Sequence, residues 1–241
     1  MTAYRLVLWD VDHTLIASGG VGGEISHAAF YKVTGVRQVL DPDVAGRTER
    51  AILTESCRLH GLDPSDYAFE DYADALAEGY LMRSGELRER GHALAGAAAA
   101  LDALAKVDGL RQTVVSGNVR RVAETKLAVF GLDRHIDFGI GGYAEDSDVR
   151  AELVRAAHRR ATAASDGDYG AAEVLIIGDT PADVEAARTA GAAVLGMATG
   201  KSSAADLLKA GAHVAMDDLT DTERLLALVS TGVPMRGGLR R

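Results

Sequence analysis

The sequence has one cysteine and no hydrophobic run long enough to cross a membrane. Cys57 is the only cysteine among 241 residues, so an intramolecular disulfide is excluded, as is usual in a reducing compartment. The most apolar stretch, residues 93–105, is short and contains Asp102. The N-terminus leads straight into an apolar segment without the pattern of a signal peptide. We therefore expect a cytoplasmic protein that does not insert into a membrane.

Basic residues are also fewer than acidic ones. The 26 lysines and arginines against 35 acidic residues give a net charge of -9, which argues against nucleic acid or an anionic membrane as the main partner. A small phosphorylated metabolite needs only a local positive site and remains a suitable partner. The hydrophobic content of 47% is typical of a globular protein with a real core. The sequence leaves open whether the chain is a monomer or a homodimer.

Two carboxylates follow the first predicted strand. Residues 6–9 are all apolar, which predicts a short strand buried on both faces. Asp10 and Asp12 come next, with Thr14 two residues further, at the strand end where α/β sheets have their ligand crevice. Two close carboxylates repel each other unless a cation lies between them or one is protonated, which indicates Mg²⁺ and a nucleophilic or acid–base role. The alternative is a strand followed by an Asp-rich turn.

The order of the remaining patterns predicts a core with an insertion. Up to residue 90 the patterns are helical, at residues 24–34, 49–60 and 65–90. After residue 95, helices alternate with predicted strands at residues 112–115, 137–140, 173–177, 193–196 and 213–216. This alternation predicts an α/β fold with a parallel, doubly wound sheet. We expect a core of residues 1–16 and 91–235, an all-helical cap at 17–90 and a basic tail at 236–241.

Polar groups also follow two of the later strands. Residues 116–118, Ser-Gly-Asn, offer a hydroxyl and turn amides at the start of a helix, which suits a phosphate, although Asn118 as a plain helix cap explains them equally. Residues 178–183, Gly-Asp-Thr-Pro-Ala-Asp, form a capping box. The capping box explains in part why Asp183 is an aspartate. It does not explain why Asp179, at the end of an apolar strand, is a carboxylate.

Taken in order, these segments resemble the motifs of the haloacid dehalogenase superfamily of phosphohydrolases. The resemblance rests on residues 10–14, Ser116, a later basic residue and residues 178–183, so it extends over the whole chain. Many members carry their cap between the first and second motifs, where this chain has its helical insertion. Residues 46–48, Gly-Arg-Thr, resemble the phosphoglycolate phosphatase branch. The resemblance implies a Rossmann-like catalytic core with a helical cap.

The resemblance also implies a Mg²⁺-dependent phosphatase that forms an aspartyl-phosphate. Asp10 would be the nucleophile, and Asp12 would be the general acid and then the general base. The implied metal ligands are Asp10, the backbone carbonyl of Asp12 and Asp179, with Asp183 orienting that set. Ser116 is expected to act with the catalytic residues on the phosphoryl oxygens. The residues expected to bind substrate are Thr14, Gly117, Asn118, Arg47 and Thr48.

The chain departs from the family pattern at two positions. Position 13 is histidine, where glycine is common, and His13 either contacts substrate or is a turn residue without a role. The lysine that the family often places before its fourth strand is missing. Arg150 has the corresponding place and could grip a phosphoryl group bidentately, while Lys126 is the second candidate. We expect Arg150 to be the catalytic cation.

Three functions remain compatible with these residues. The leading hypothesis is a phosphatase for small phosphate monoesters, with phosphoglycolate as the first candidate because Arg47 suits a small anionic leaving group. The first alternative is a phosphomutase of the β-phosphoglucomutase type, which shares the core and differs in its cap. The second is a non-catalytic phospholigand-binding protein, against which Asp10, Asp12 and Asp179 argue.

Overall fold

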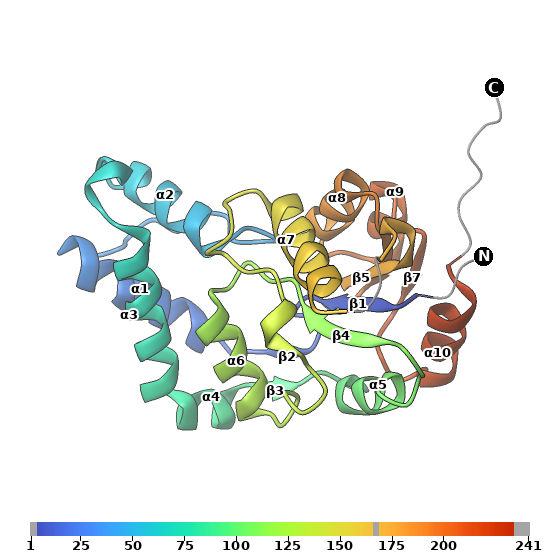
Figure 1. Ribbon diagram of the computed structural model, residues 1–241. Helices are drawn as coiled ribbons and strands as arrows, with labels where there is room; N and C mark the ends of the chain where they lie inside the picture. Colours follow the sequence, from blue (N-terminus) through green and yellow to red (C-terminus); the bar gives the residue numbers. More distant parts are fainter. Residues whose placement is uncertain (1–3, 166–168, 234–241) are drawn as a thin grey trace.

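The computed structural model describes residues 4–165 and 169–233 (Figure 1). The tail expected at residues 236–241 lies outside this range. A five-stranded parallel sheet forms the centre of the larger part, with the strand order β4-β1-β5-β6-β7. In that order the strands are Arg111–Val114, Leu6–Trp9, Val174–Gly178, Ala193–Met197 and Val214–Met216. The prediction of a parallel, doubly wound α/β core is confirmed.

Strand β1 is an interior strand of this sheet, and its side chains pack on both faces. Val7 and Trp9 belong to one hydrophobic cluster, whereas Leu6 and Leu8 belong to the cluster on the opposite face. All four are fully buried, as expected for a strand between two helical layers. Strand β1 pairs with β4 on one side and with β5 on the other. The chain therefore leaves β1 at Asp10, between the carboxyl ends of β4 and β5.

Helices cover both faces of the sheet. One face packs against α5, α6 and α10, which span Ala97–Leu104, Arg120–Val129 and Thr222–Thr231. The other packs against α7, α8 and α9, which span Arg150–Ala163, Pro181–Ala190 and Ala204–Ala210. Small residues at the contacts, many of them alanines, allow these helices to lie close to the strands.

The remaining helices form the helical segment, residues 17–90, on one side of the sheet (Figure 1). They are α1, α2, α3 and α4, which span Val21–Thr34, Glu49–Leu59, Phe69–Met82 and Ser84–Arg90, with a 3₁₀ turn at Pro64–Asp66. A two-stranded antiparallel ribbon, β2 (Ile16–Ala17) with β3 (His92–Ala93), joins the two ends of this segment. The chain therefore leaves the core and returns to it at one place.

The helical segment shares its hydrophobic cluster with the core. Val119 and Val122, at the start of α6, are buried in the same cluster as the side chains of α1 and α3. Gly22 of α1 faces α3 closely, since a Cβ atom there would lie 2.6 Å from the hydroxyl oxygen of Tyr80. The predicted long helix at residues 65–90 is interrupted at Arg83, where α3 ends and α4 begins.

The predicted strand at residues 137–140 is wrong. Residues Phe138–Ile140 form a 3₁₀ helix instead. The Asp137 carboxylate accepts a hydrogen bond from the Gly139 amide at 3.0 Å and turns the chain, a common role of Asp before a turn. Just after β4, a single parallel bridge pairs Val115 with Gly142, in place of a full strand beside β4.

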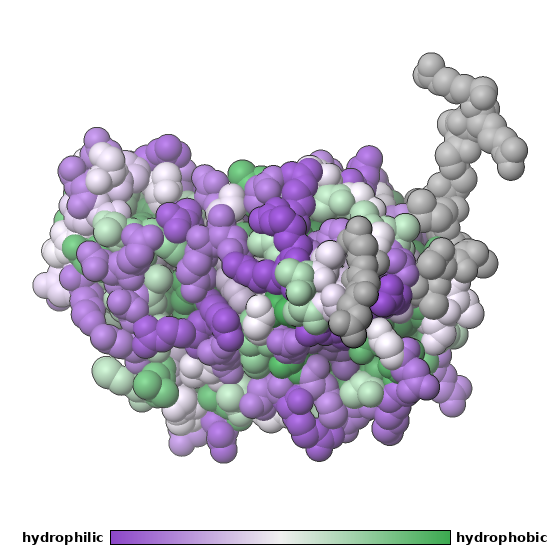
Figure 2. Space-filling model, viewed as in Figure 1, coloured by the Kyte–Doolittle hydropathy of each residue, from purple (hydrophilic) through white to green (hydrophobic). Residues whose placement is uncertain are grey.

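The face of the molecule in Figure 2 is mostly hydrophilic, with smaller apolar areas between. Within residues 4–165 and 169–233, none of the helices combines the length and the apolar character that crossing a bilayer requires.

We predict that Gln112→Leu destabilises the core. Gln112 Oε1 accepts a hydrogen bond from the indole Nε1 of Trp9 at 3.1 Å, and both side chains are buried. Leucine has a similar size but leaves the indole N–H unpaired, which lowers the free energy of unfolding by about 2 kcal/mol. Urea unfolding followed by fluorescence measures this directly, because Trp9 is the only tryptophan.

Gln38→Leu is the matched control, because the Gln38 amide donates to the exposed Asp41 and the Gln38 oxygen has no hydrogen-bond partner among the described residues, so leucine leaves no buried donor unpaired. We expect it to change the free energy of unfolding by less than about 0.5 kcal/mol. Equal stability of Gln112→Leu and the wild type would contradict the prediction.

Candidate active site

The polar residues expected at the strand ends meet at one edge of the sheet. Asp10 directly follows β1, Ser116 lies two residues after the end of β4, and Asp179 directly follows β5. All three are buried, with Asp10 7% exposed, Ser116 1% and Asp179 3%. Because β1 lies between β4 and β5, its carboxyl end has these groups on either side.

Three carboxylates form a buried cluster there. Asp10, Asp179 and Asp183 each offer an oxygen atom within 4.8 Å of the others. Burial, and after it the charge of the neighbouring Asp183, raises the pKa of Asp179 to about 7 against the opposing effect of Arg150. Burial likewise raises the pKa of Asp10, against the effect of Arg150. Such a set of hard oxygen donors fits Mg²⁺, whose charge would favour the ionised carboxylates.

Each member of this cluster is held in place by its local structure. Thr180 caps α8, and its hydroxyl donates to Asp183 Oδ2 at 2.7 Å, so the capping box expected from the sequence fixes that carboxylate. The Thr14 hydroxyl donates to Asp179 Oδ1 at 3.4 Å. Thr14 therefore contacts Asp179, a metal ligand expected from the sequence, and its role toward substrate stays a prediction.

Arg150 reaches this cluster from the start of α7. Its Nη2 donates to Asp10 Oδ1 at 2.7 Å and to Asp183 Oδ1 at 2.6 Å, and its side chain is 9% exposed. The guanidinium therefore binds both the expected nucleophile and the carboxylate expected to orient the metal ligands. A further donor, Nη1, lies 3.5 Å from the carbonyl oxygen of Gly46 in the helical segment.

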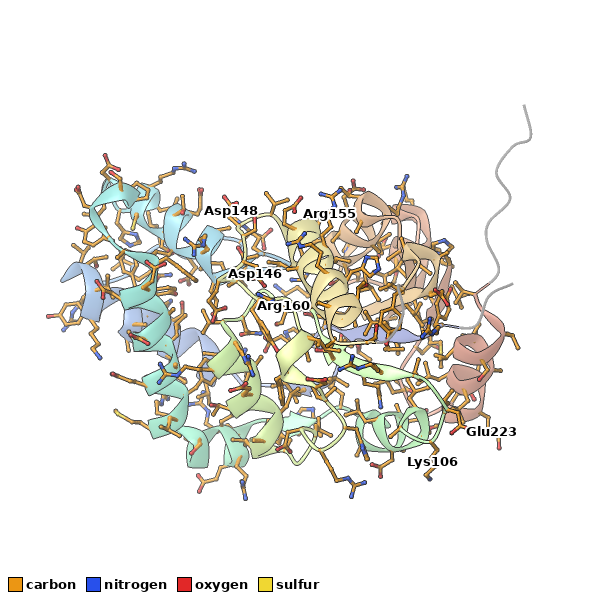
Figure 3. The ribbon with its side chains drawn as sticks, in the orientation of Figure 1. Lys106, Asp146, Asp148, Arg155, Arg160 and Glu223 are labelled. Carbon is orange, nitrogen blue, oxygen red and sulfur yellow. The ribbon has the colours of Figure 1, made fainter. Side chains whose placement is uncertain are left out.

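Arg160 also fixes the loop before α7 through an ion pair and a hydrogen bond. Arg160, two turns or more along α7, donates to Asp146 Oδ1 at 2.6 Å and Oδ2 at 2.8 Å, and to the carbonyl oxygen of Gly141. Figure 3 shows Asp146 and Arg160 beside this loop, with Asp148 further along it. The ion pair holds the loop that leads into α7 and so sets where Arg150 begins the helix.

Asp12 has a different cation. Lys126 Nζ donates to Asp12 Oδ1 at 2.9 Å and Oδ2 at 2.7 Å, and Asn118 Nδ2 donates to Asp12 Oδ2 at 2.8 Å. Burial would raise the pKa of Asp12, but Lys126 and Asn118 outweigh it and hold that pKa below its ordinary value. The two aspartates at the end of β1 therefore lie in opposite electrostatic environments. The second cation candidate from the sequence lies at the site, on Asp12 rather than on Asp10.

The turn after β4 is closed by the helical segment. Ser116 Oγ accepts hydrogen bonds from the amide of Asn118 at 3.2 Å and from its side chain at 2.7 Å. A Cβ atom on Gly117 would lie 2.1 Å from the carbonyl oxygen of Arg47, so only glycine allows this approach. The Gly117 carbonyl also accepts a hydrogen bond from the Glu49 amide at 2.7 Å.

The side chains of Arg47 and Thr48 form hydrogen bonds with backbone groups of their own segment and not with the carboxylate cluster. The Arg47 guanidinium donates to the carbonyl oxygens of Asp43 and Ala51, both at 3.4 Å, within its own segment. Thr48 is the N-cap of α2 and is buried. Their substrate-binding role stays a prediction, and it would require the Arg47 side chain to change its contacts.

His13 has the backbone conformation that explains why glycine is common at its position. Its φ is +60°, and among the described residues it is the one non-glycine with a positive φ. Its carbonyl oxygen accepts a hydrogen bond from the Thr199 hydroxyl, and its side chain is exposed.

Two residues near the site were not among those expected from the sequence. A Cβ atom on Gly200 would lie 1.9 Å from Asp179 Oδ2, so the loop after β6 closes directly on the carboxylate cluster. This loop could have been identified from the sequence, because it follows β6, the neighbour of β5, and ligands bind at the carboxyl ends of parallel strands. Glu49, at the start of α2, accepts a hydrogen bond from the Val119 amide at 2.6 Å. Burial raises the pKa of Glu49 to about 8.

Comparison with known proteins places this geometry in context. The family model described as haloacid dehalogenase-like hydrolase matches residues 7–188. A hydrolase from Pseudomonas syringae has a similar structure, with a TM-score of 0.66 and 21% identity over 95% of this chain and 100% of that one. A predicted phosphatase from Clostridium acetobutylicum gives 0.67 and 18% over 94% and 100%. A predicted phosphoglycolate phosphatase from Haemophilus somnus 129pt gives 0.60 and 18% over 94% and 99%. The comparison with curated proteins gave no match.

We predict that Glu49 makes the stability of the protein depend on pH. The pKa of Glu49 is about 8 in the folded chain against an ordinary value of 4.5, so between these values the folded state holds a proton that the unfolded state has lost. The free energy of unfolding therefore falls as pH rises through this window. Glu49→Gln keeps the oxygen that faces Val119 but does not ionise.

Urea unfolding at pH 5 and pH 8 tests this. The wild type should lose more stability between the two pH values than Glu49→Gln does. Glu55→Gln, on the same helix, is the control and should keep the wild-type pH dependence. Equal slopes for the wild type and Glu49→Gln would show that Glu49 does not carry the effect.

Proposed function

Because the chain belongs to the haloacid dehalogenase-like hydrolase family, we propose that it hydrolyses small phosphate monoesters through an aspartyl-phosphate, an acyl phosphate, on Asp10, with Mg²⁺ as cofactor. One observation carries the proposal. Asp10 and Asp12 lie at the same strand end, but Arg150 binds one and Lys126 binds the other. Asp10 belongs to the carboxylate cluster, where a bound Mg²⁺ would keep it ionised for attack, whereas Asp12 lies outside that cluster beside its own cation, so the two carboxylates can serve different roles.

In this mechanism, Asp10 attacks phosphorus, and the ester oxygen leaves with a proton from Asp12. Water then attacks the phosphorus of the aspartyl-phosphate, its proton passes to Asp12, and the carboxylate of Asp10 is restored. Ser116 and the amides of its turn bind phosphoryl oxygens, and Arg150 adds positive charge beside Asp10. Bound Mg²⁺, held by Asp10, the Asp12 carbonyl and Asp179, would neutralise charge on the phosphoryl group.

The substrate class follows from how closely the helical segment approaches the core. The backbone of residues 46–49 contacts the turn at Gly117 and the loop at Thr180, since a Cβ on Gly46 would lie 2.8 Å from Thr180 Oγ1. A small, soluble phosphorylated acid or sugar suits such a site, and phosphoglycolate is the first candidate. We propose a cytoplasmic monomer or homodimer without nucleic acid or membrane partners, in line with the net charge of -9.

A panel of phosphate esters tests the function. It contains phosphoglycolate, hexose phosphates and p-nitrophenyl phosphate, and the readout is released inorganic phosphate. Release of phosphate from at least one ester supports the proposal. Conversion of a hexose 1-phosphate to the 6-phosphate without phosphate release would instead indicate a phosphomutase, and no turnover of any ester would overturn the proposal.

We predict that Asp10→Asn abolishes turnover while the fold is kept. Asparagine has the same shape but lacks the attacking oxygen anion, so kcat should fall by about 10³-fold or more. Rapid acid quenching of a reaction with ³²P-labelled substrate should find labelled phosphate on the wild-type chain and none on the variant. Near wild-type turnover in Asp10→Asn would assign the nucleophile elsewhere.

We also predict a requirement for a divalent cation. Chelation should abolish activity, and Mg²⁺ should restore it better than Ca²⁺, which prefers more ligands and a looser geometry. Asp179→Asn should raise the Mg²⁺ concentration needed for half-maximal activity by at least about tenfold. Glu185→Gln, an exposed change on α8, is the control. Activity that survives exhaustive chelation would exclude the metal.

A further inference from the structure

Lys126, the second cation candidate from the sequence, is buried beside Asp12 rather than Asp10. It lies in the last turn of α6, and its side chain is 4% exposed, whereas that of Asp12 is 35% exposed. An ammonium group has three N–H donors, and three oxygens lie in contact with this one. They are the two carboxylate oxygens of Asp12, at 2.9 and 2.7 Å, and Asn118 Oδ1 at 2.7 Å.

These contacts fix the orientation of the Asp12 carboxylate. Lys126 binds both of its oxygens, and Asn118 donates to one of them while accepting from Lys126. Rotation of the carboxylate would break at least two charge-assisted hydrogen bonds, which are stronger than neutral ones. The donors of Lys126 are thereby committed to Asp12 and Asn118 and not to a phosphoryl oxygen.

Lys126 is itself held by the helical segment. Its ammonium lies 4.9 Å from the centre of the Tyr80 ring on α3, a cation–π distance. The position of the ammonium thus depends on α6 from the core and on α3 packed against it.

We propose that Lys126, together with Asn118, is a positioning residue that orients Asp12 for hydrolysis of the aspartyl-phosphate. This proposal rests on the proposed function. In that step a water oxygen bonds to phosphorus and the bond from phosphorus to Asp10 breaks, with its electron pair returning to the Asp10 carboxylate. One water proton passes to Asp12, and inorganic phosphate leaves. Asp12 must present an oxygen to the attacking water, and the contacts with Lys126 and Asn118 keep that oxygen in place.

The test compares Lys126→Met with the wild type on p-nitrophenyl phosphate. Nitrophenolate leaves without a proton, so formation of the aspartyl-phosphate does not need Asp12 and its hydrolysis does. We expect kcat to fall about 10²-fold, the loss typical of a misplaced catalytic group, with a KM no higher than that of the wild type. Acid quenching at steady state should find a larger phosphorylated fraction of the variant than of the wild type.

Two further variants complete the design. Arg121→Met removes a cation from the exposed side of the same helix, where Arg121 pairs with Asp74, and should leave kcat unchanged. Lys126→Gln keeps an N–H donor without the charge, so it should lose less activity than Lys126→Met and remains informative if the methionine variant fails to fold. Thermal unfolding of each variant separates loss of fold from loss of rate.

The outcomes differ in what they overturn. A raised KM with less phosphoenzyme would mean that Lys126 binds the phosphoryl group, and an unchanged kcat would mean that it has no role in the step. Either result overturns the positioning role while the wild type still hydrolyses esters. If the folded wild type releases phosphate from no ester, the proposed function fails, and the role of Lys126 falls with it.

Discussion

The structure depends on a balance of buried charge at the end of β1. Four carboxylates meet two cations there, and neither cation is shared between Asp10 and Asp12. Breaking a buried ion pair on one side leaves an uncompensated charge, which is strongly unfavourable. The local structures around the site, from the cap of α8 to the ion pair at the start of α7, keep each charge beside its partner. The geometry of the site is therefore a condition for the fold as well as for chemistry.

The sequence predicted the sheet and the carboxylates for a simple reason. Strands buried on both faces appear as apolar runs, and β1 and β5 have them, so Asp10 and Asp179 stand out at their ends. The strand at residues 137–140 failed because a side-chain hydrogen bond from Gly139 to Asp137 turns the backbone, and alternation of side chains cannot report that. The helix predicted at residues 49–60 agrees with α2 to within one residue, because Thr48 caps its start and Gly61 follows its end.

The sequence could not show which cation pairs with which carboxylate. Asp12 and Lys126 are 114 residues apart, and only the packing of α6 brings them together. The sequence offered Arg150 and Lys126 as competitors for one role, whereas the structure gives each its own carboxylate. The close approaches at Gly46, Gly117 and Gly200 were hidden in the same way, because a glycine in a sequence does not show what lies against it.

Helix α6 belongs to two parts of the molecule at once. Val119 and Val122 complete the hydrophobic cluster of the helical segment, and Lys126 lies under Tyr80 while it binds Asp12. Divergence of the helical segment toward a new substrate is consequently constrained by the core. Transplanting residues 17–90 from a relative would present α6 with a foreign surface, so a working chimera would have to carry α6 along with the graft.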